Sequence, residues 1–224
     1  MKKKIGTVTI GQAPRTDVMA DIIPILGNDV EIVEAGALDG LSKEEIAAFA
    51  PVKGDYVLVT RLTDGSSVQV AEKYITPRII EKIQKHFEND IPLVLLLCTG
   101  EFPEFSEKGL LIRPQRILFH AVDALARGKK LGVLTPSPDQ VAQSAKRWGE
   151  LSKEVKVLAS SPYVDGMKNA EAAAKELAAW GADLVILDCI GYTSAMQQTV
   201  RDIVGSPAIL GRGIAARTVK ELLG

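Results

Sequence analysis

The chain has 224 residues, enough for one large or two small domains with a substantial buried core. Its composition is that of an ordinary globular protein, with 46% hydrophobic and 25% charged residues. A net charge of −1 gives no electrostatic basis for binding nucleic acid or an anionic membrane surface, so neither is an expected partner.

The chain shows no pattern typical of targeting or of membrane insertion. The lysine run at 2–4 is expected to be the solvated start of a strand, since no apolar segment follows it. No stretch approaches the roughly 18 apolar residues that a spanning helix needs. Two widely separated cysteines, Cys98 and Cys189, are typical of reduced thiols. We therefore expect a cytoplasmic protein, with a secreted protein holding one disulfide as the alternative.

Short apolar runs alternate with amphipathic segments along the whole chain. The first run, 5–10, leads through a turn into a helix; Pro14 suits the first helical turn, and Val18, Ile22 and Ile25-Leu26 give the helix an apolar stripe. Further strands are expected at 30–33, 56–60, 67–70, Leu93–Leu97, 130–135, 155–158, Leu184–Leu187 and 208–210. Further helices are expected at 42–50, with a capping box from Ser42, and at 71–88, 114–127, 138–151, 168–180, 194–204 and up to Leu223.

This alternation is typical of a parallel α/β sheet. A faint repeat adds to it: residues 4–9 (KIGTVT) resemble residues 130–135 (KLGVLT), and a cysteine-terminated strand follows each copy. Two similar parallel-sheet lobes, each giving one cysteine to a shared cleft, would explain the repeat; chance similarity is the alternative. We expect an N-terminal lobe over 1–112, a C-terminal lobe over 113–206, and a terminal strand and helix over 207–224 returning to the first lobe.

Both cysteines lie where a buried strand runs out into a loop. In parallel α/β sheets, ligands bind at this carboxyl edge. A thiol acts as a base or nucleophile only as a thiolate. Neither cysteine has a histidine nearby in sequence, since His86 and His120 fall in predicted helices, and the spacing does not suit a zinc site. The residues therefore leave two interpretations open, a pair of catalytic thiols or two buried packing residues.

Two arginines follow predicted strands at one expected edge of the sheet. Arg15 lies in a strand-to-helix turn that favours an anion, unless it pairs with a neighbouring acid. Arg61 follows the third strand. It could be a second residue that binds a carboxylate, or it could form a surface ion pair. Residues 211–216 (GRGIAA) formally match a dinucleotide fingerprint, but no second strand follows, so we expect only a tight turn there.

Several motifs resemble those of known families. Cys98-Thr99-Gly100 and residues 189–193 (CIGYT), each after an apolar strand, resemble the paired cysteine motifs of the aspartate/glutamate/hydantoin racemase superfamily. Residues 9–17 (TIGQAPRTD) and 59–65 (VTRLTDG), with the two cysteine segments, resemble the AroM family more specifically. This second resemblance covers essentially the whole chain, and it indicates the fold more than the function.

The resemblance implies two pseudo-symmetric α/β lobes around a cofactor-independent site in the cleft between them. It implies that Cys98 and Cys189 are the general acid/base pair. One thiolate would remove the proton α to a carboxylate, and the other thiol would deliver a proton to the opposite face; related members use a single cysteine for decarboxylation or isomerisation. Arg61, a candidate from its place after a strand, joins the positions expected around the substrate. These positions are Gln12, Arg15, Arg61, Thr99, Gly100, Tyr192 and Thr193.

Two positions depart from the racemase pattern. Racemases usually carry a polar residue such as asparagine after the first cysteine and Thr-His after the second, where this chain has Thr99 and Ile190-Gly191. Glu101 and Tyr192 are candidates to replace the missing histidine. We expect a racemase, isomerase or decarboxylase for a small carboxylate. The alternative is a binding or sensing protein that has kept the cleft and lost the chemistry. No metal or cofactor is expected, and the superfamily suggests a homodimer.

Overall fold

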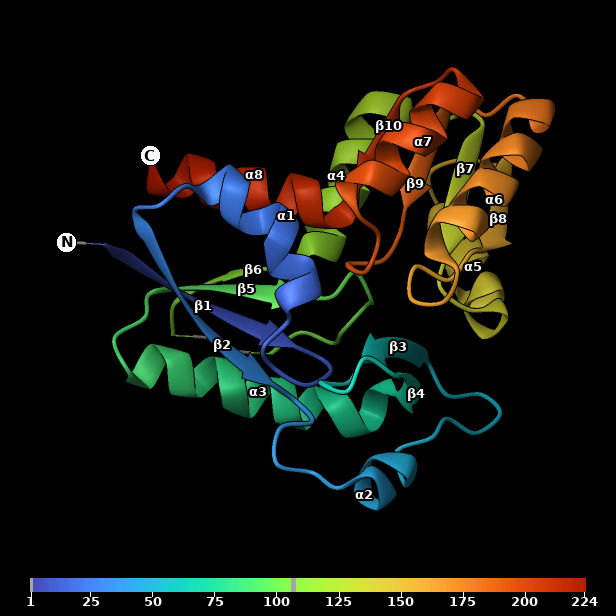
Figure 1. Cartoon of the computed structure of the whole chain (residues 1–224). Helices are drawn as coiled ribbons and strands as arrows, with labels where there is room; N and C mark the ends of the chain where they lie inside the picture. The colour runs from blue at the N-terminus through green and yellow to red at the C-terminus, as the bar shows by residue number, and fades with distance from the viewer. Residues whose placement is uncertain (1, 106–107) are drawn as a thin grey trace. The chain divides into compact units, whose positions relative to one another are not determined.

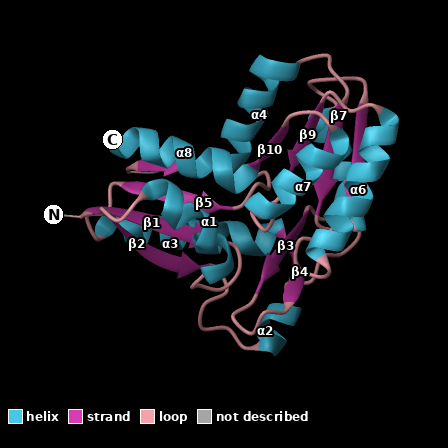
Figure 2. Ribbon diagram, turned by 45° about the horizontal axis from the view of Figure 1, so that its top comes forward, coloured by secondary structure: helices cyan, strands magenta, loops and turns pink. Residues whose placement is uncertain are grey.

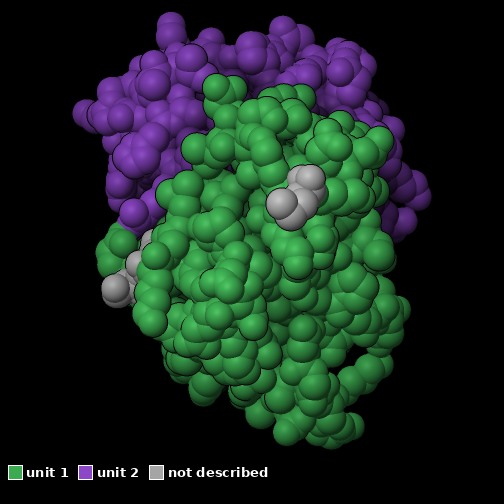
Figure 3. All heavy atoms as spheres, turned by 90° about the vertical axis from the view of Figure 1, so that its left-hand side faces the viewer, with its two compact units in different colours: residues 1–114, 215–224 green, residues 115–214 purple. Residues whose placement is uncertain are grey.

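The computed structural model describes residues 2–105 and 108–224 (Figure 1). It divides into two compact units, residues 1–114 with 215–224 and residues 115–214 (Figure 3). Each unit holds a four-stranded parallel sheet with helices on both faces, which confirms the predicted α/β class (Figure 2). The last helix, α8 (Gly211–Leu223), begins in the second unit and continues in the first.

The sheet of the first unit has the order β2-β1-β5-β6. Its strands are β1 (Lys3–Thr9), β2 (Val30–Gly36), β5 (Leu93–Leu97) and β6 (Leu110–Ile112). Two helices cover it, α1 (Thr16–Leu26) and α3 (Glu72–Glu88), on opposite faces (Figure 1). The buried isoleucines Ile75, Ile79 and Ile83 recur at helical spacing, and this stripe of α3 packs with Val8 and Leu96 of the sheet.

An antiparallel hairpin of β3 (Val57–Arg61) and β4 (Ser67–Ala71) stands outside this sheet. This corrects the expectation that the run at 56–60 is a strand of the parallel sheet. Leu58 and Val70 of the hairpin are buried in the same core as α3. The short helix α2 (Lys43–Ala47) opens with the predicted capping box, in which Ser42 Oγ accepts the Glu45 N–H and the Glu45 carboxylate accepts the Ser42 N–H.

The sheet of the second unit has the order β10-β9-β7-β8. Its strands are β7 (Leu131–Thr135), β8 (Val155–Ala159), β9 (Leu184–Leu187) and β10 (Ala208–Leu210). Its helices are α4 (Pro114–Ala126), α5 (Val141–Trp148), α6 (Gly166–Trp180) and α7 (Ser194–Val204). Alternate residues of β9 face opposite cores, since Val185 and Leu187 pack with α6 and α7, whereas Leu184 and Ile186 pack with α4 and Trp148.

The two sheets have one topology, because β2-β1-β5-β6 corresponds strand for strand to β8-β7-β9-β10. Gly6 of β1 lies opposite Val94 of β5, and Gly132 of β7 lies opposite Val185 of β9. These glycines are the shared glycine of the sequence repeat. Chance similarity therefore does not explain the repeat, which marks the central strand of each unit.

Each of these two glycines leaves space for a side chain of a helix that packs on the sheet. A Cβ on Gly6 would lie 2.8 Å from His86 Cγ of α3, and a Cβ on Gly132 would lie 2.8 Å from Leu177 Cδ1 of α6. Both distances are so short that a larger residue would force the His86 or Leu177 side chain to move. His86 is thus a core residue of the first unit, 5% exposed, with Nε2 3.3 Å from the Thr7 carbonyl oxygen.

Three features differ from the sequence-based expectation. Strand β6, which pairs with β5, was not predicted. Residues 138–140 form a separate 3-10 turn, so α5 begins only at Val141. Strand β10 pairs with β9, so the expected terminal segment 207–224 is divided: the strand lies in the second unit and residues 215–224 lie in the first.

Replacing His86 by leucine is expected to reduce the acid sensitivity of the fold. Burial lowers the pKa of His86 below its usual 6.5, so below that pH the unfolded chain binds a proton more readily than the folded one. Stability should therefore fall from pH 7.5 to pH 5.5 in the wild type, and fall less in His86→Leu. Urea unfolding followed by far-UV circular dichroism at both pH values measures this, and equal losses would contradict it.

Candidate active site

Cys98 directly follows β5, and its thiol is held by the loop that it opens. Val94, Leu96 and Cys98 are alternate residues facing one core, and Cys98 is 8% exposed. The Gly100 N–H donates to Cys98 Sγ over 3.2 Å. A Cβ at position 100 would lie 2.6 Å from Leu58 Cδ2, so a larger residue would force the Leu58 side chain to move. The amide of Gly100, expected to serve a substrate carboxylate, therefore serves the thiol.

Cys189 follows β9 after one intervening residue, and its thiol is held in the same way. It packs in the core with Leu187 and is 6% exposed. The Gly191 N–H donates to Cys189 Sγ over 3.3 Å, and Tyr163 Oη lies 3.5 Å from the same sulfur. A Cβ on Gly191 would lie 2.6 Å from Tyr163 Oη, so the glycine leaves room for the tyrosine.

The two cysteines occupy equivalent positions of the two sheets. Cys98 is the fourth residue after Val94, and Cys189 is the fourth after Val185, the two valines that lie opposite the repeat glycines. Each sulfur accepts the amide of the glycine two residues later. Hydrogen bonds donated to sulfur favour the thiolate over the thiol. Each unit thus has, at the carboxyl edge of its sheet, one thiol whose sulfur accepts a backbone N–H.

Tyr192 and Thr193 shape the loop that carries Cys189. Tyr192 is completely buried, and its hydroxyl donates to the Ser160 carbonyl. Burial is the main cause that raises the pKa of Tyr192 well above its usual 10, and the neighbouring Cys189, negatively charged as a thiolate, is the second cause. The Tyr192 hydroxyl therefore stays protonated. Thr193 Oγ1 accepts the Met196 N–H over 3.2 Å and so caps α7. Thr99 of the first unit is also buried, 5% exposed.

Arg15 and Arg61 line one pocket of about 310 Å³ in the first unit. Arg15 is 2% exposed, and its Nε and Nη2 donate to the two carboxylate oxygens of Asp17, each over 2.8 Å. Pairing with a neighbouring acid, the alternative left open by the sequence, is therefore present. Arg61 Nη1 lies 4.0 Å from Asp17 Oδ2. Two guanidinium groups therefore lie around the Asp17 carboxylate, and a second carboxylate, that of Glu34, accepts the Arg15 N–H over 2.8 Å.

The position of Arg61 corrects one expectation. It ends a strand of the hairpin and not a strand of the sheet, and it meets the β1–α1 loop because the hairpin packs against that loop. Gln12 makes this connection, since its Oε1 accepts the N–H of Thr63 over 2.9 Å and the hydroxyl of Thr63 over 3.0 Å. The structure therefore brings Gln12, Arg15 and Arg61 together.

Sequence reasoning missed two groups beside Cys189. Tyr163 follows β8 at the carboxyl edge of the sheet, so the rule that singled out the cysteines would also have found it. Asp188 directly precedes Cys189; its buried carboxylate pairs with Arg147 and accepts the Trp148 Nε1–H over 2.9 Å. A charged residue at the end of an apolar strand was the available signal.

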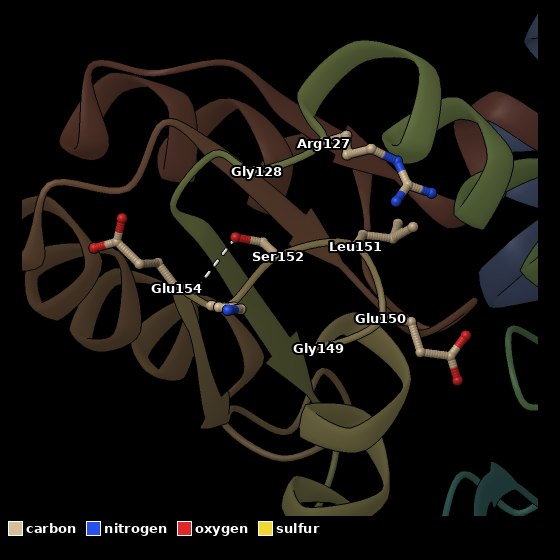
Figure 4. A pocket seen from close by; sticks show the side chains of 8 residues that line it. Arg127, Gly128, Gly149, Glu150, Leu151, Ser152 and Glu154 are labelled. Atoms are coloured by element: carbon tan, nitrogen blue, oxygen red, sulfur yellow. Dashed lines mark hydrogen bonds between the residues drawn. The ribbon is translucent and has the colours of Figure 1, made fainter.

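Another pocket, of about 440 Å³, lies in the second unit at the opposite edge of its sheet (Figure 4). Arg127, Glu150, Lys153 and Glu154 give it charges of both signs, and Ser152 Oγ accepts the Glu154 N–H over 3.1 Å. It lies before the strands β7 and β8, away from the edge where α/β sheets bind ligands, and we assign it no role.

Within residues 2–105 and 108–224, no three His, Cys, Asp or Glu side chains gather in a way that could hold a metal ion. Among the helices described, none is long and apolar enough to cross a membrane.

Solved structures similar to this chain include racemases and a decarboxylase. Allantoin racemase from Klebsiella pneumoniae has a TM-score of 0.63 at 14% identity, over 98% of this chain and 87% of that chain. Unliganded arylmalonate decarboxylase has a TM-score of 0.63 at 12% identity, over 100% and 93%. Glutamate racemase from Francisella tularensis, in complex with D-glutamate, has a TM-score of 0.59 at 16% identity, over 99% and 81%. These likenesses show the two-lobe racemase fold.

The sequence comparisons identify the family. No curated protein matches the chain. The family model described as AroM protein matches residues 5–223, nearly the whole chain, which confirms the resemblance inferred from the motifs. The protein therefore belongs to the AroM family.

Proposed function

We propose that the protein is a cofactor-independent acid/base enzyme for a small carboxylate, with Cys98 and Cys189 as its acid/base pair. One observation carries the proposal: the two cysteines hold equivalent register positions in two equivalent sheets, and each sulfur accepts the amide of a following glycine. Packing alone requires neither the equivalence nor the amides. The fold, shared with racemases and a decarboxylase, is consistent with this chemistry.

The proposed reaction consists of two proton transfers. One cysteine, as thiolate, takes the proton from the carbon next to the carboxylate; the other, as thiol, gives a proton to that carbon from the opposite side. After one turnover the two protonation states are exchanged, and no oxidant, reductant or metal enters the balance. The carbanion needs hydrogen-bond donors and positive charge near the carboxylate.

The candidate donors come from both units. Thr99 lies directly after Cys98, and the Thr193 hydroxyl, which accepts from Met196, keeps its own hydrogen for a carboxylate. Arg15 and Arg61 line the pocket of the first unit, and Gln12 joins the two loops that carry them through its bonds to Thr63. The contacts of Tyr192 and Gly100 favour a supporting role for them: Tyr192 holds the Ser160 carbonyl and Gly100 holds the Cys98 sulfur.

Exchange of the Cα hydrogen for deuterium tests this function. Single enantiomers of small amino, hydroxy and malonic acids are incubated with the protein in D2O, and the Cα–H signal is followed by proton NMR. We expect exchange, or loss of CO2 from a malonate, with at least one class of compound. The Cys98→Ala/Cys189→Ala double variant, checked by circular dichroism for folding, should lose it. Equal rates in both proteins would refute the cysteine mechanism.

A binding protein without catalysis is the second candidate. Ile190 and Gly191 stand where racemases usually carry Thr-His; Ile190 is 3% exposed and Gly191 has no side chain, so neither supplies a proton-transferring group. The same NMR experiment separates the candidates. Line broadening of a carboxylate by the protein, without exchange across the whole panel, would favour binding over catalysis.

A further inference from the structure

Tyr163 gives Cys189 a second polar neighbour from a different loop. Its Oη lies 3.5 Å from Cys189 Sγ, on a sulfur that already accepts the Gly191 N–H. In the first unit, Tyr56 lies beside Gly100, and its hydroxyl accepts the Glu101 N–H over 3.2 Å. Each cysteine loop therefore has a tyrosine beside its glycine, and the structure places the Tyr163 hydroxyl on the sulfur itself.

Several hydrogen bonds hold the loop that carries Tyr163. The Tyr163 N–H donates to Ser161 Oγ over 3.2 Å, and Asn169 Nδ2 donates to the Val164 carbonyl over 2.7 Å. Ser160, at the start of the loop, donates its N–H to Thr135 O over 2.7 Å. The ring then occupies the space that Gly191 leaves open. The position of the hydroxyl is thus determined by both loops.

The ionisation state of the sulfur decides the direction of this hydrogen bond. A thiolate has no hydrogen, so beside a Cys189 thiolate the Tyr163 O–H must donate, as the Gly191 N–H does. Donors on a thiolate stabilise the charged form. Tyr192, the candidate suggested by the sequence, holds the Ser160 carbonyl with its hydroxyl. Tyr163 is therefore the tyrosine placed to compensate for the histidine that the second motif lacks.

We propose that Tyr163 is the positioning residue for Cys189, whose hydroxyl donates to the thiolate and holds it ready to accept the substrate proton. Only the acceptance of a substrate proton by Cys189 rests on the proposed function. The ionisation of the thiol is a property of the protein without substrate, and it can be measured alone.

A cysteine-specific NMR titration tests the proposal. The chain has two cysteines, so protein labelled with 13C at cysteine Cβ gives two signals, assigned with a Cys98→Ser variant. In Tyr163→Phe we expect the titration midpoint of Cys189 to rise by about one pH unit, a tenfold loss of thiolate. The midpoint of Cys98 serves as the internal reference and should stay in place. Tyr74→Phe, which removes a hydroxyl from the exposed side of α3, should move neither midpoint.

The outcomes separate this proposal from the proposed function. An unchanged Cys189 midpoint in Tyr163→Phe would overturn the role of Tyr163, whether or not the protein exchanges a substrate proton. A shifted midpoint without exchange of any carboxylate would leave the role of Tyr163 standing and count against the enzyme. If Tyr163→Phe does not fold, protein containing 3-fluorotyrosine keeps the shape and makes the phenol a stronger donor. The Cys189 midpoint should then fall relative to that of Cys98, and no change would overturn the proposal.

Discussion

Cys98→Ala is expected to lower the racemisation rate by about 10³-fold while leaving isotope exchange on one enantiomer. A positioned general acid or base contributes roughly 10²–10⁴-fold, and racemisation needs one on each side of the carbon. With Cys98 removed, Cys189 can still take a proton from the enantiomer that faces it and return deuterium to the same side. Cys189→Ala should show the same pattern with the other enantiomer. Proton NMR for exchange and polarimetry for racemisation measure the two rates.

The paired design makes this prediction sharp. Each single variant is the control for the other, because both remove a buried sulfur of similar exposure, 8% and 6%, from equivalent positions. A general loss of folding would reduce exchange of both enantiomers equally, and circular dichroism would show it. If both variants kept exchange on the same enantiomer, the two thiols would not act on opposite sides, and the acid/base pair would be wrong. For a decarboxylase that needs one thiol, only one variant would lose activity.

Much of the fold was predictable because long apolar runs and helical stripes are local signals. The strands at Leu93–Leu97 and Leu184–Leu187 and the helix at 71–88 agree with the structure. The repeat could be detected because both copies contain a glycine, Gly6 and Gly132, and each glycine leaves space for a helix side chain. Strand β6 was missed because its pairing with β5 depends on a partner distant in sequence. Both strands of the hairpin were predicted, but their local pattern does not show that they pair with each other outside the parallel sheet.

The candidate site was predictable only in part, for a related reason. The motifs located Cys98, Cys189 and the two arginines, since each follows a recognisable strand. What each side chain does depends on its neighbours in space. Arg15 donates to Asp17, and Tyr192 turns to Ser160, while Tyr163, 26 residues from Cys189 in the chain, reaches the sulfur. No pattern within one segment contains that contact, although the position of Tyr163 after a strand was visible.

Asp188→Ala is expected to lower the free energy of unfolding of the second unit by about 3–5 kcal/mol. The side chains of Asp188 and Arg147 are 2% and 5% exposed and form an ion pair, and Asp188→Ala takes this carboxylate away from a buried guanidinium group. The Trp148 Nε1–H also loses its acceptor. Urea unfolding followed by tryptophan fluorescence measures the effect, because both tryptophans, Trp148 and Trp180, belong to the second unit.

An exposed ion pair of the same unit provides the matched control. Glu176 lies 2.7 Å from Lys156, with side chains 54% and 31% exposed, and Glu176→Ala should cost at most about 1 kcal/mol. A loss for Asp188→Ala no larger than this would show that the buried pair does not support the loop before Cys189. Replacing both partners, Asp188→Leu with Arg147→Met, should restore much of the lost stability, because both charges of the buried pair are then removed. A double variant as unstable as Asp188→Ala would instead point to the Trp148 hydrogen bond as the dominant contact.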